Sequence, residues 1–121
     1  METRFAQQMK KGVLEMAVLQ QLARAPDHGY ALLLRLRQES GGLLDLKEGT
    51  LYPILYRLED DGRIVSAWTA GGESAARSRA TPKKIYTITE SGRALLAQEK
   101  AAWRQLAACI EEMLAQPEEE K

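Results

Sequence analysis

The residues best placed for chemistry lie between positions 49 and 60, where hydroxyl groups and a guanidinium recur at helical spacing. The apolar residues Leu51, Ile54, Leu55 and Leu58 follow the i, i+3, i+4, i+7 pattern of a buried helix face. The opposite side and its flanks then carry Thr50, Tyr52, Pro53, Tyr56 and Arg57. Hydroxyls and a guanidinium can donate to phosphate oxygens or base edges, so this face, with both tyrosines exposed, favours nucleic-acid reading. The alternative is an ordinary solvated helix face.

A second group of charged residues is the basic stretch that follows position 69. The stretch and its end contain Arg77, Arg79, Lys83 and Lys84 against one acid, Glu73. The whole chain has 17 basic and 17 acidic residues, a net charge of zero, so it has no global attraction for phosphate. A local patch is therefore needed for DNA binding, and this stretch predicts one. Arginines in a solvated loop are the alternative.

Catalytic and metal-binding residues do not gather anywhere in the sequence. Its one histidine, His28, and one cysteine, Cys109, have no companions at a recognisable ligand or nucleophile spacing. We therefore expect no enzyme, no metal site and no cofactor, with His28 structural and Cys109 a small apolar filler. A single cysteine fits a reducing cytoplasm, and no apolar run is long enough for a membrane span, so we expect a cytoplasmic protein without a membrane partner.

The elements that must position these residues follow from periodicity and turn signals. Helical patterns cover residues 7–25, 29–39 and a segment starting between 46 and 50 and ending near 60. Asp27 is expected to cap the second helix. Segments rich in β-branched and aromatic residues, 64–68 and 84–89, predict a hairpin with a long tip. The order predicts a mainly α (α+β) fold, a winged helix-turn-helix.

A long last helix, expected to be capped by Thr89, extends this plan. Its residues Leu96, Glu99, Trp103, Leu106, Ile110 and Met113 alternate spacings of three and four, a heptad-like seam. About 25 residues of helix reach ~38 Å, more than so small a core can cover, and a second copy is the simplest partner. We predict a DNA-binding domain at 1–89, a dimerisation helix at 90–116 and an acidic tail at 117–121.

Two stretches of these elements carry recognisable motifs, residues 26–30 (Pro-Asp-His-Gly-Tyr) and 49–59 (Gly-Thr-Leu-Tyr-Pro-Ile-Leu-Tyr-Arg-Leu-Glu). Together with Trp68 and residues 84–89 in the wing, they resemble the PadR family of transcriptional regulators. The single C-terminal helix is similar to that of the short PadR group. The resemblance implies a homodimeric winged-helix DNA-binding repressor, with Thr50, Tyr52, Tyr56 and Arg57 in the recognition helix.

The resemblance also implies a ligand site. Trp103 aligns with a tryptophan that, in multidrug-responsive relatives, lines a cavity between the subunits and stacks on flat aromatic ligands. Glu99 and Leu106 are its expected neighbours in such a site. Filling of the dimer core by Trp103 is the alternative role, because seam tryptophans often serve packing alone.

The sequence therefore predicts a dimeric, sequence-specific repressor. Its paired third helices would read an inverted repeat in double-stranded DNA, with half-sites about 34 Å apart. A small aromatic effector near the dimer interface would release it. The alternative is a winged-helix module that binds a protein through Tyr52 and Tyr56, with no DNA.

Overall fold

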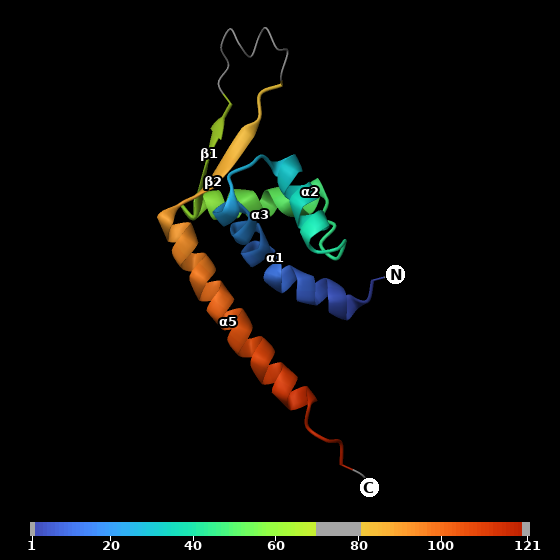
Figure 1. The fold of residues 1–121 in the computed structure, drawn as a ribbon. Helices are drawn as coiled ribbons and strands as arrows, with labels where there is room; N and C mark the ends of the chain where they lie inside the picture. The colour runs from blue at the N-terminus through green and yellow to red at the C-terminus, as the bar shows by residue number, and fades with distance from the viewer. Residues whose placement is uncertain (1, 70–80, 120–121) are drawn as a thin grey trace.

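The computed structural model describes residues 2–69 and 81–119, which form a helical body with a hairpin at one end and a long helix leading away from it (Figure 1). The elements are α1 (Arg4–Arg24), α2 (Gly29–Glu39), α3 (Glu48–Asp60), β1 (Ile64–Trp68), β2 (Lys84–Ile88) and α5 (Glu90–Leu114). This order confirms the predicted mainly α winged-helix fold. None of the helices within the described ranges has the length and apolar character needed to cross a membrane.

The core lies where the first three helices meet the base of the hairpin. α1 contributes Val18, Leu19 and Leu22, and α2 contributes Leu32 and Leu36, all buried. All four residues expected on the buried face of α3, Leu51, Ile54, Leu55 and Leu58, are buried as well. Because the core side of α3 is fixed in this way, its opposite side must face outwards.

The hairpin forms the wing. β1 and β2 pair antiparallel, from Ile64 opposite Ile88 to Trp68 opposite Lys84. Tyr86 in β2 is buried, and its backbone also pairs with Asp27, which adds an isolated bridge to the sheet. The two hydrogen bonds of that bridge measure 2.9 and 3.3 Å between nitrogen and oxygen. The connection between α1 and α2 is thereby fastened to the wing.

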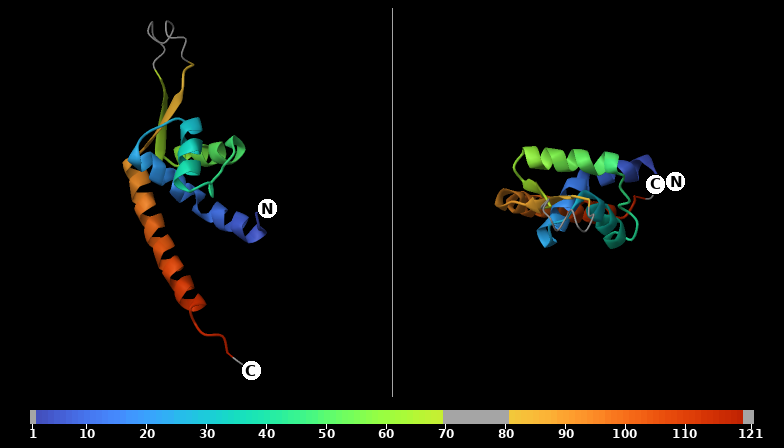
Figure 2. Two further views of the ribbon diagram at one scale, coloured as in Figure 1. Left: turned by 45° about the vertical axis from the view of Figure 1, so that its right-hand side comes forward. Right: turned by 90° about the horizontal axis from the view of Figure 1, so that it is seen from above.

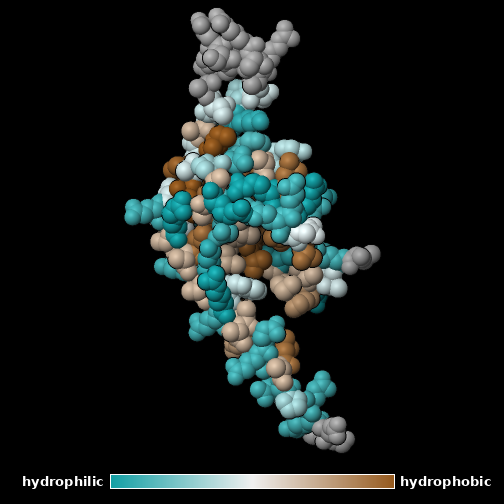
Figure 3. Space-filling model, viewed as in Figure 1, coloured by the Kyte–Doolittle hydropathy of each residue, from teal (hydrophilic) through white to brown (hydrophobic). Residues whose placement is uncertain are grey.

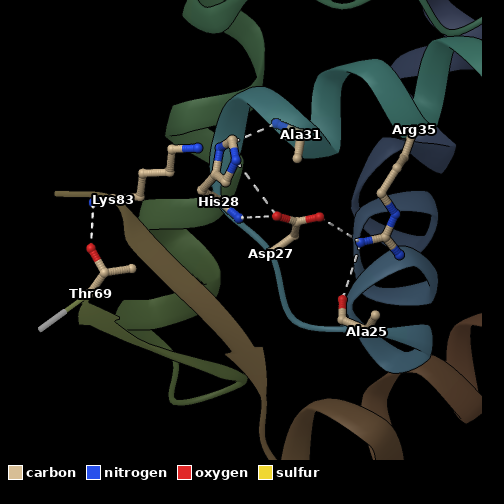
Figure 4. Close-up of polar contacts among 7 residues, drawn as sticks. All are labelled: Ala25, Asp27, His28, Ala31, Arg35, Thr69 and Lys83. Atoms are coloured by element: carbon tan, nitrogen blue, oxygen red, sulfur yellow. Dashed lines mark hydrogen bonds and ion pairs between the residues drawn. The ribbon is translucent and has the colours of Figure 1, made fainter. Parts of the chain in front are cut away.

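The start of α2 differs from the predicted Asp27 cap. His28 is the N-cap, and its Nδ1 accepts from the amide of Ala31 at 3.4 Å. Asp27 lies one residue too early because its backbone is held in the bridge to Tyr86. Its carboxylate instead accepts from the amide of His28 at 2.9 Å and lies 3.6 Å from the guanidinium of Arg35 (Figure 4). His28 is thus structural, as expected.

The start of α5 is anchored on the turn between α3 and β1. Thr89 caps the helix as predicted, accepting from the amide of Gly92 at 3.1 Å. Its hydroxyl also lies 2.7 Å from the carbonyl oxygen of Gly62 and 2.9 Å from that of Arg63. A Cβ at Gly92 would collide with the Arg63 carbonyl, so only glycine lets α5 approach this turn so closely.

Candidate nucleic-acid interface

The exposed side of α3 is open along its length. Seen from above, α3 lies along one edge of the helical body (Figure 2, right). Thr50, Pro53, Tyr56 and Arg57 are exposed, with Tyr56 at 52%. Pro53 is accommodated inside the helix, in its second turn. Four of the five residues predicted on this face therefore lie together on an accessible surface.

Tyr52 is an exception, because the expectation that both tyrosines are exposed is wrong for this one. It is half-buried and packs against the core, and a Cβ at Gly29 would collide with its hydroxyl. Burial, followed by the charge of Glu48, raises the pKa of Tyr52. Its ring centroid lies 6.0 Å from that of Tyr56. Tyr52 thus lies beside Tyr56 and packs α3 against the start of α2.

Arg57 is the cation on this face of α3. Its side chain is 58% exposed, and its Nη2 lies 3.5 Å from the Glu15 carboxylate on α1. An exposed pair at this distance is weak, on the order of 0–1 kcal/mol. Glu15 therefore orients the guanidinium of Arg57. Because the pair is weak, a phosphate oxygen can replace the Glu15 carboxylate at small cost.

The wing residues divide by their surroundings. Lys83 is exposed, and its backbone pairs with that of Thr69, whose hydroxyl also accepts from the Lys83 amide at 2.9 Å (Figure 4). Lys84 is held within the chain, 3.8 Å from the Glu59 carboxylate and 5.7 Å from the centre of the Tyr86 ring. The predicted contacts Arg77 and Arg79 lie outside the described residues.

A shallow cleft beside the outer half of the wing contains two residues, Tyr30 and Trp68, that were not predicted from the sequence to belong to the interface. It encloses about 230 Å³ between the start of α2, α3 and the hairpin. Tyr30 and Trp68 line it and are largely exposed, beside Lys83 and His28. The Lys83 side chain points toward His28 (Figure 4). In the sequence, the only sign that Tyr30 and Trp68 belong to this surface was their place in the motifs that resemble the family. The cleft itself forms only when α2 packs beside the wing.

Away from this face, α1 and α5 enclose an apolar cavity of about 400 Å³. The three predicted ligand residues, Glu99, Trp103 and Leu106, all line it, opposite Val13 and Met16 of α1. A larger hollow of about 720 Å³, on the side of Leu43 and Leu44, shares Trp103. The space-filling view shows hydrophobic surface between the two helices (Figure 3). The structure thus brings the predicted ligand residues into one cavity.

Glu99 is the acidic group of this cavity. Its Oε1 is buried and has no hydrogen-bond donor among the residues that the structure describes. Burial, followed by the negative charge of Glu15, raises the pKa of Glu99, while Arg63 acts in the opposite direction.

The predicted dimer seam is only partly available. Trp103, Leu106, Ile110 and Met113 are exposed, and Trp103 is 44% exposed. Leu96 is only 5% exposed, because it packs into the core of its own chain, so it has little surface to offer a second copy. Cys109 is exposed within this single chain rather than filling its core.

Comparison with known proteins identifies the family. Residues 18–98 match the model of the transcriptional regulator PadR-like family. The chain is 32% identical over 81 residues to the negative transcriptional regulator PadR of Bacillus subtilis, aligning with 67% of this chain but only 41% of that protein. It is 30% identical over 100 residues to a transcriptional regulator of Mycobacterium tuberculosis, covering 83% of this chain and 84% of that protein.

Solved structures agree with this assignment. A PadR family transcriptional regulator from Eggerthella lenta has a TM-score of 0.78 at 32% identity, over 93% of this chain and 91% of that one. A PadR-like regulator from Bacillus cereus has a TM-score of 0.75 at 28% identity, over 91% and 99%. The family consists of transcriptional regulators, which confirms the expectation that the chain is not an enzyme. The chain belongs to the PadR-like family of transcriptional regulators.

Proposed function

We propose that this protein is a homodimeric repressor that binds a specific double-stranded DNA operator through α3. The observation that carries the proposal is the accessible set on α3, Thr50, Pro53, Tyr56 and Arg57, held outwards by four buried apolar residues on the opposite side. A helix fixed in this way can enter a major groove, with side chains reaching base edges and phosphates. Tyr52 is half-buried and lies at the edge of this set.

The wing supplies the flanking contacts in this proposal. Lys83 is exposed at the outer end of the paired strands, beside the cleft that Tyr30 and Trp68 line. Lys84 contributes positive charge while paired with Glu59. Arg77 and Arg79 belong to the same basic stretch by sequence. Since the net charge of the chain is zero, attraction to DNA has to come from this side of the molecule.

Fluorescence anisotropy with duplex fragments of the protein's own upstream region tests DNA binding. We expect affinity to fall steeply as salt rises, and Arg57→Ala to weaken binding and reduce the salt slope by about one unit. Arg24→Ala is the matched control, because Arg24 is an exposed arginine on α1 that pairs with Glu39. Equal losses in both variants would contradict a specific role for Arg57.

Dimerisation is proposed through the end of α5. The exposed residues Trp103, Leu106, Ile110 and Met113 form an apolar stripe that a second α5 can cover. Two α3 helices could then meet successive major grooves of an inverted repeat, about 34 Å apart. Sedimentation of the purified chain tests this, and a monomer at high concentration would overturn it.

Release by an aromatic effector is the remaining part of the proposal. The cavity beside Trp103 is largely apolar and has one acidic group, Glu99, which suits a flat aromatic molecule. A planar phenolic or cationic compound should quench tryptophan emission. Quenching that persists in Trp68→Phe and disappears in Trp103→Ala would support the cavity, whereas equal loss in both would not.

A protein-binding module is the second candidate. Two observations favour it: the chain has no net positive charge to attract DNA, and the exposed Tyr56 can contact a protein surface. Undetectable or salt-insensitive DNA binding would support this candidate and overturn the repressor.

A further inference from the structure

Two large aromatic side chains are exposed beside α3. Tyr30, near the start of α2, is 59% exposed, and Trp68, at the end of β1, is 65% exposed. Both line the shallow cleft of about 230 Å³ beside the wing. Large aromatic rings are costly to leave in water, so two of them in one cleft indicate a surface that binds a partner.

The charges around the cleft suit an anionic partner. Lys83, Lys84 and His28 line it, and no carboxylate does so among the residues that the structure describes. Lys83 is exposed, and its side chain points toward His28 (Figure 4). Two carboxylates of neighbouring residues are already engaged: Asp27 accepts from the His28 amide at 2.9 Å, and Glu59 lies 3.8 Å from Lys84. Negative charge on a partner is therefore attracted rather than repelled.

The cleft is continuous with the exposed face of α3. Tyr52 lines the cleft from α3, and its ring centroid lies 6.0 Å from that of Tyr56 on the exposed face. A duplex whose major groove receives α3 presents the strand at the rim of that groove to the adjacent elements of the protein. That strand carries regular negative charge and apolar sugar surfaces, which match a cleft made of cations and aromatic rings.

We propose that this cleft binds the sugar–phosphate backbone of the DNA strand that borders the groove read by α3. The Tyr30 hydroxyl and the Trp68 indole N–H donate to phosphate oxygens, and the two rings pack on deoxyribose. Lys83 neutralises a phosphate at the same place. Such contacts fix the position of α3 in the groove without reading bases. This inference rests on the proposed DNA-binding function and names the part of the DNA that is held outside α3.

Anisotropy with two duplexes of equal length, one from the upstream region and one of unrelated sequence, tests the proposal. We expect Tyr30→Ala and Trp68→Ala each to weaken binding of both duplexes equally, by about tenfold, the effect of one hydrogen bond to a charged group. Val65→Ala is the matched control, because Val65 is an exposed apolar residue of β1 outside the cleft. A loss confined to the upstream duplex would mean base reading and would overturn the proposal, as would an equal loss in Val65→Ala or no loss at all.

Salt dependence separates the charged contact from the uncharged ones. Lys83→Gln should reduce the slope of log affinity against log salt by about one unit, because one phosphate contact is lost. Tyr30→Phe keeps the ring and removes the hydroxyl, so it should weaken binding and leave the slope unchanged. An unchanged slope in Lys83→Gln would overturn the assignment of a phosphate to this cleft.

Fluorine NMR of the protein labelled with 5-fluorotryptophan observes the cleft directly. The sequence has two tryptophans, Trp68 and Trp103, so two signals are expected, and Trp68→Phe assigns them. Once anisotropy shows that the duplex is bound, the Trp68 signal should shift and become insensitive to exchange of H2O for D2O, because the ring has left water. An unchanged Trp68 signal in the bound protein would overturn this inference and leave the repressor standing. Absence of DNA binding would overturn both and leave the protein-binding module.

Discussion

The two halves of α5 carry the same apolar spacing but have opposite surroundings. Its first two turns are fastened to the chain's own core, where Gly92 and Leu96 are buried and Thr89 caps the helix on the turn after α3. From Ala101 to Leu114, every residue except Ala107 is exposed. Hydrophobic periodicity therefore encodes a helix with an apolar side, while the partner of that side depends on which surfaces the fold brings near.

Because of this difference, the two halves of α5 have separate roles. The anchored half fixes the direction in which α5 leaves the body, as Figure 1 shows. The exposed half presents Trp103 and its neighbours at a distance set by that direction. In the proposed dimer, a small change at the anchor would alter the spacing of the two α3 helices. Substitutions in the two halves should accordingly fail in different ways.

The largest loss of stability is expected at the anchor, in Gly92→Ala. The added methyl would collide with the backbone carbonyl of Arg63 and the side chain of Ile88, which cannot both move aside. We expect a loss of at least about 3 kcal/mol in the free energy of unfolding, measured in urea. Gly49→Ala is the control, because a methyl there meets no atom. A stable Gly92→Ala variant would show that the anchor is looser than described.

The next prediction compares two leucines of the same helix. Leu96→Ala empties a core position, and we expect a loss of about 2–3 kcal/mol in the free energy of unfolding with little direct effect on self-association. Leu106→Ala should leave the folded subunit intact and raise the dissociation constant of the proposed dimer at least about tenfold. Urea unfolding and sedimentation measure the two quantities separately. Reversed effects would mean that the anchored and exposed halves are assigned wrongly.

The same contrast explains what the sequence could and could not predict. The buried face of α3 followed from local periodicity, because Leu51, Ile54, Leu55 and Leu58 point to one side in any straight helix. The seam of α5 was predicted by the same rule, yet Leu96 belongs to the core of its own chain. Periodicity places a residue on a face and does not say which neighbour covers it.

The site shows a similar limit. Thr50, Tyr56 and Arg57 were predicted from their positions opposite the core and are exposed. Tyr52 is half-buried because α2 begins directly beneath it, at Gly29. The contact between Glu15 and Arg57 joins residues 42 positions apart, so no local pattern contains it. What the sequence missed are contacts between elements, which depend on how the helices pack.

The smallest effects are expected at the two threonine caps, which repeat the comparison without touching any apolar residue. The Thr89 hydroxyl accepts from the Gly92 amide and also bonds the carbonyls of the turn after α3, whereas the Thr3 hydroxyl accepts from the amide of Ala6 at the exposed start of α1. Loss of a cap costs about 0.5–2 kcal/mol, and the upper part of that range applies where the cap also holds tertiary contacts. We expect Thr89→Ala to lower the free energy of unfolding by about 1.5 kcal/mol and Thr3→Ala by about 0.5 kcal/mol. Equal losses in urea would mean that the bonds from Thr89 to the turn add nothing beyond capping, and that the anchor of α5 rests on Gly92 and Leu96 alone.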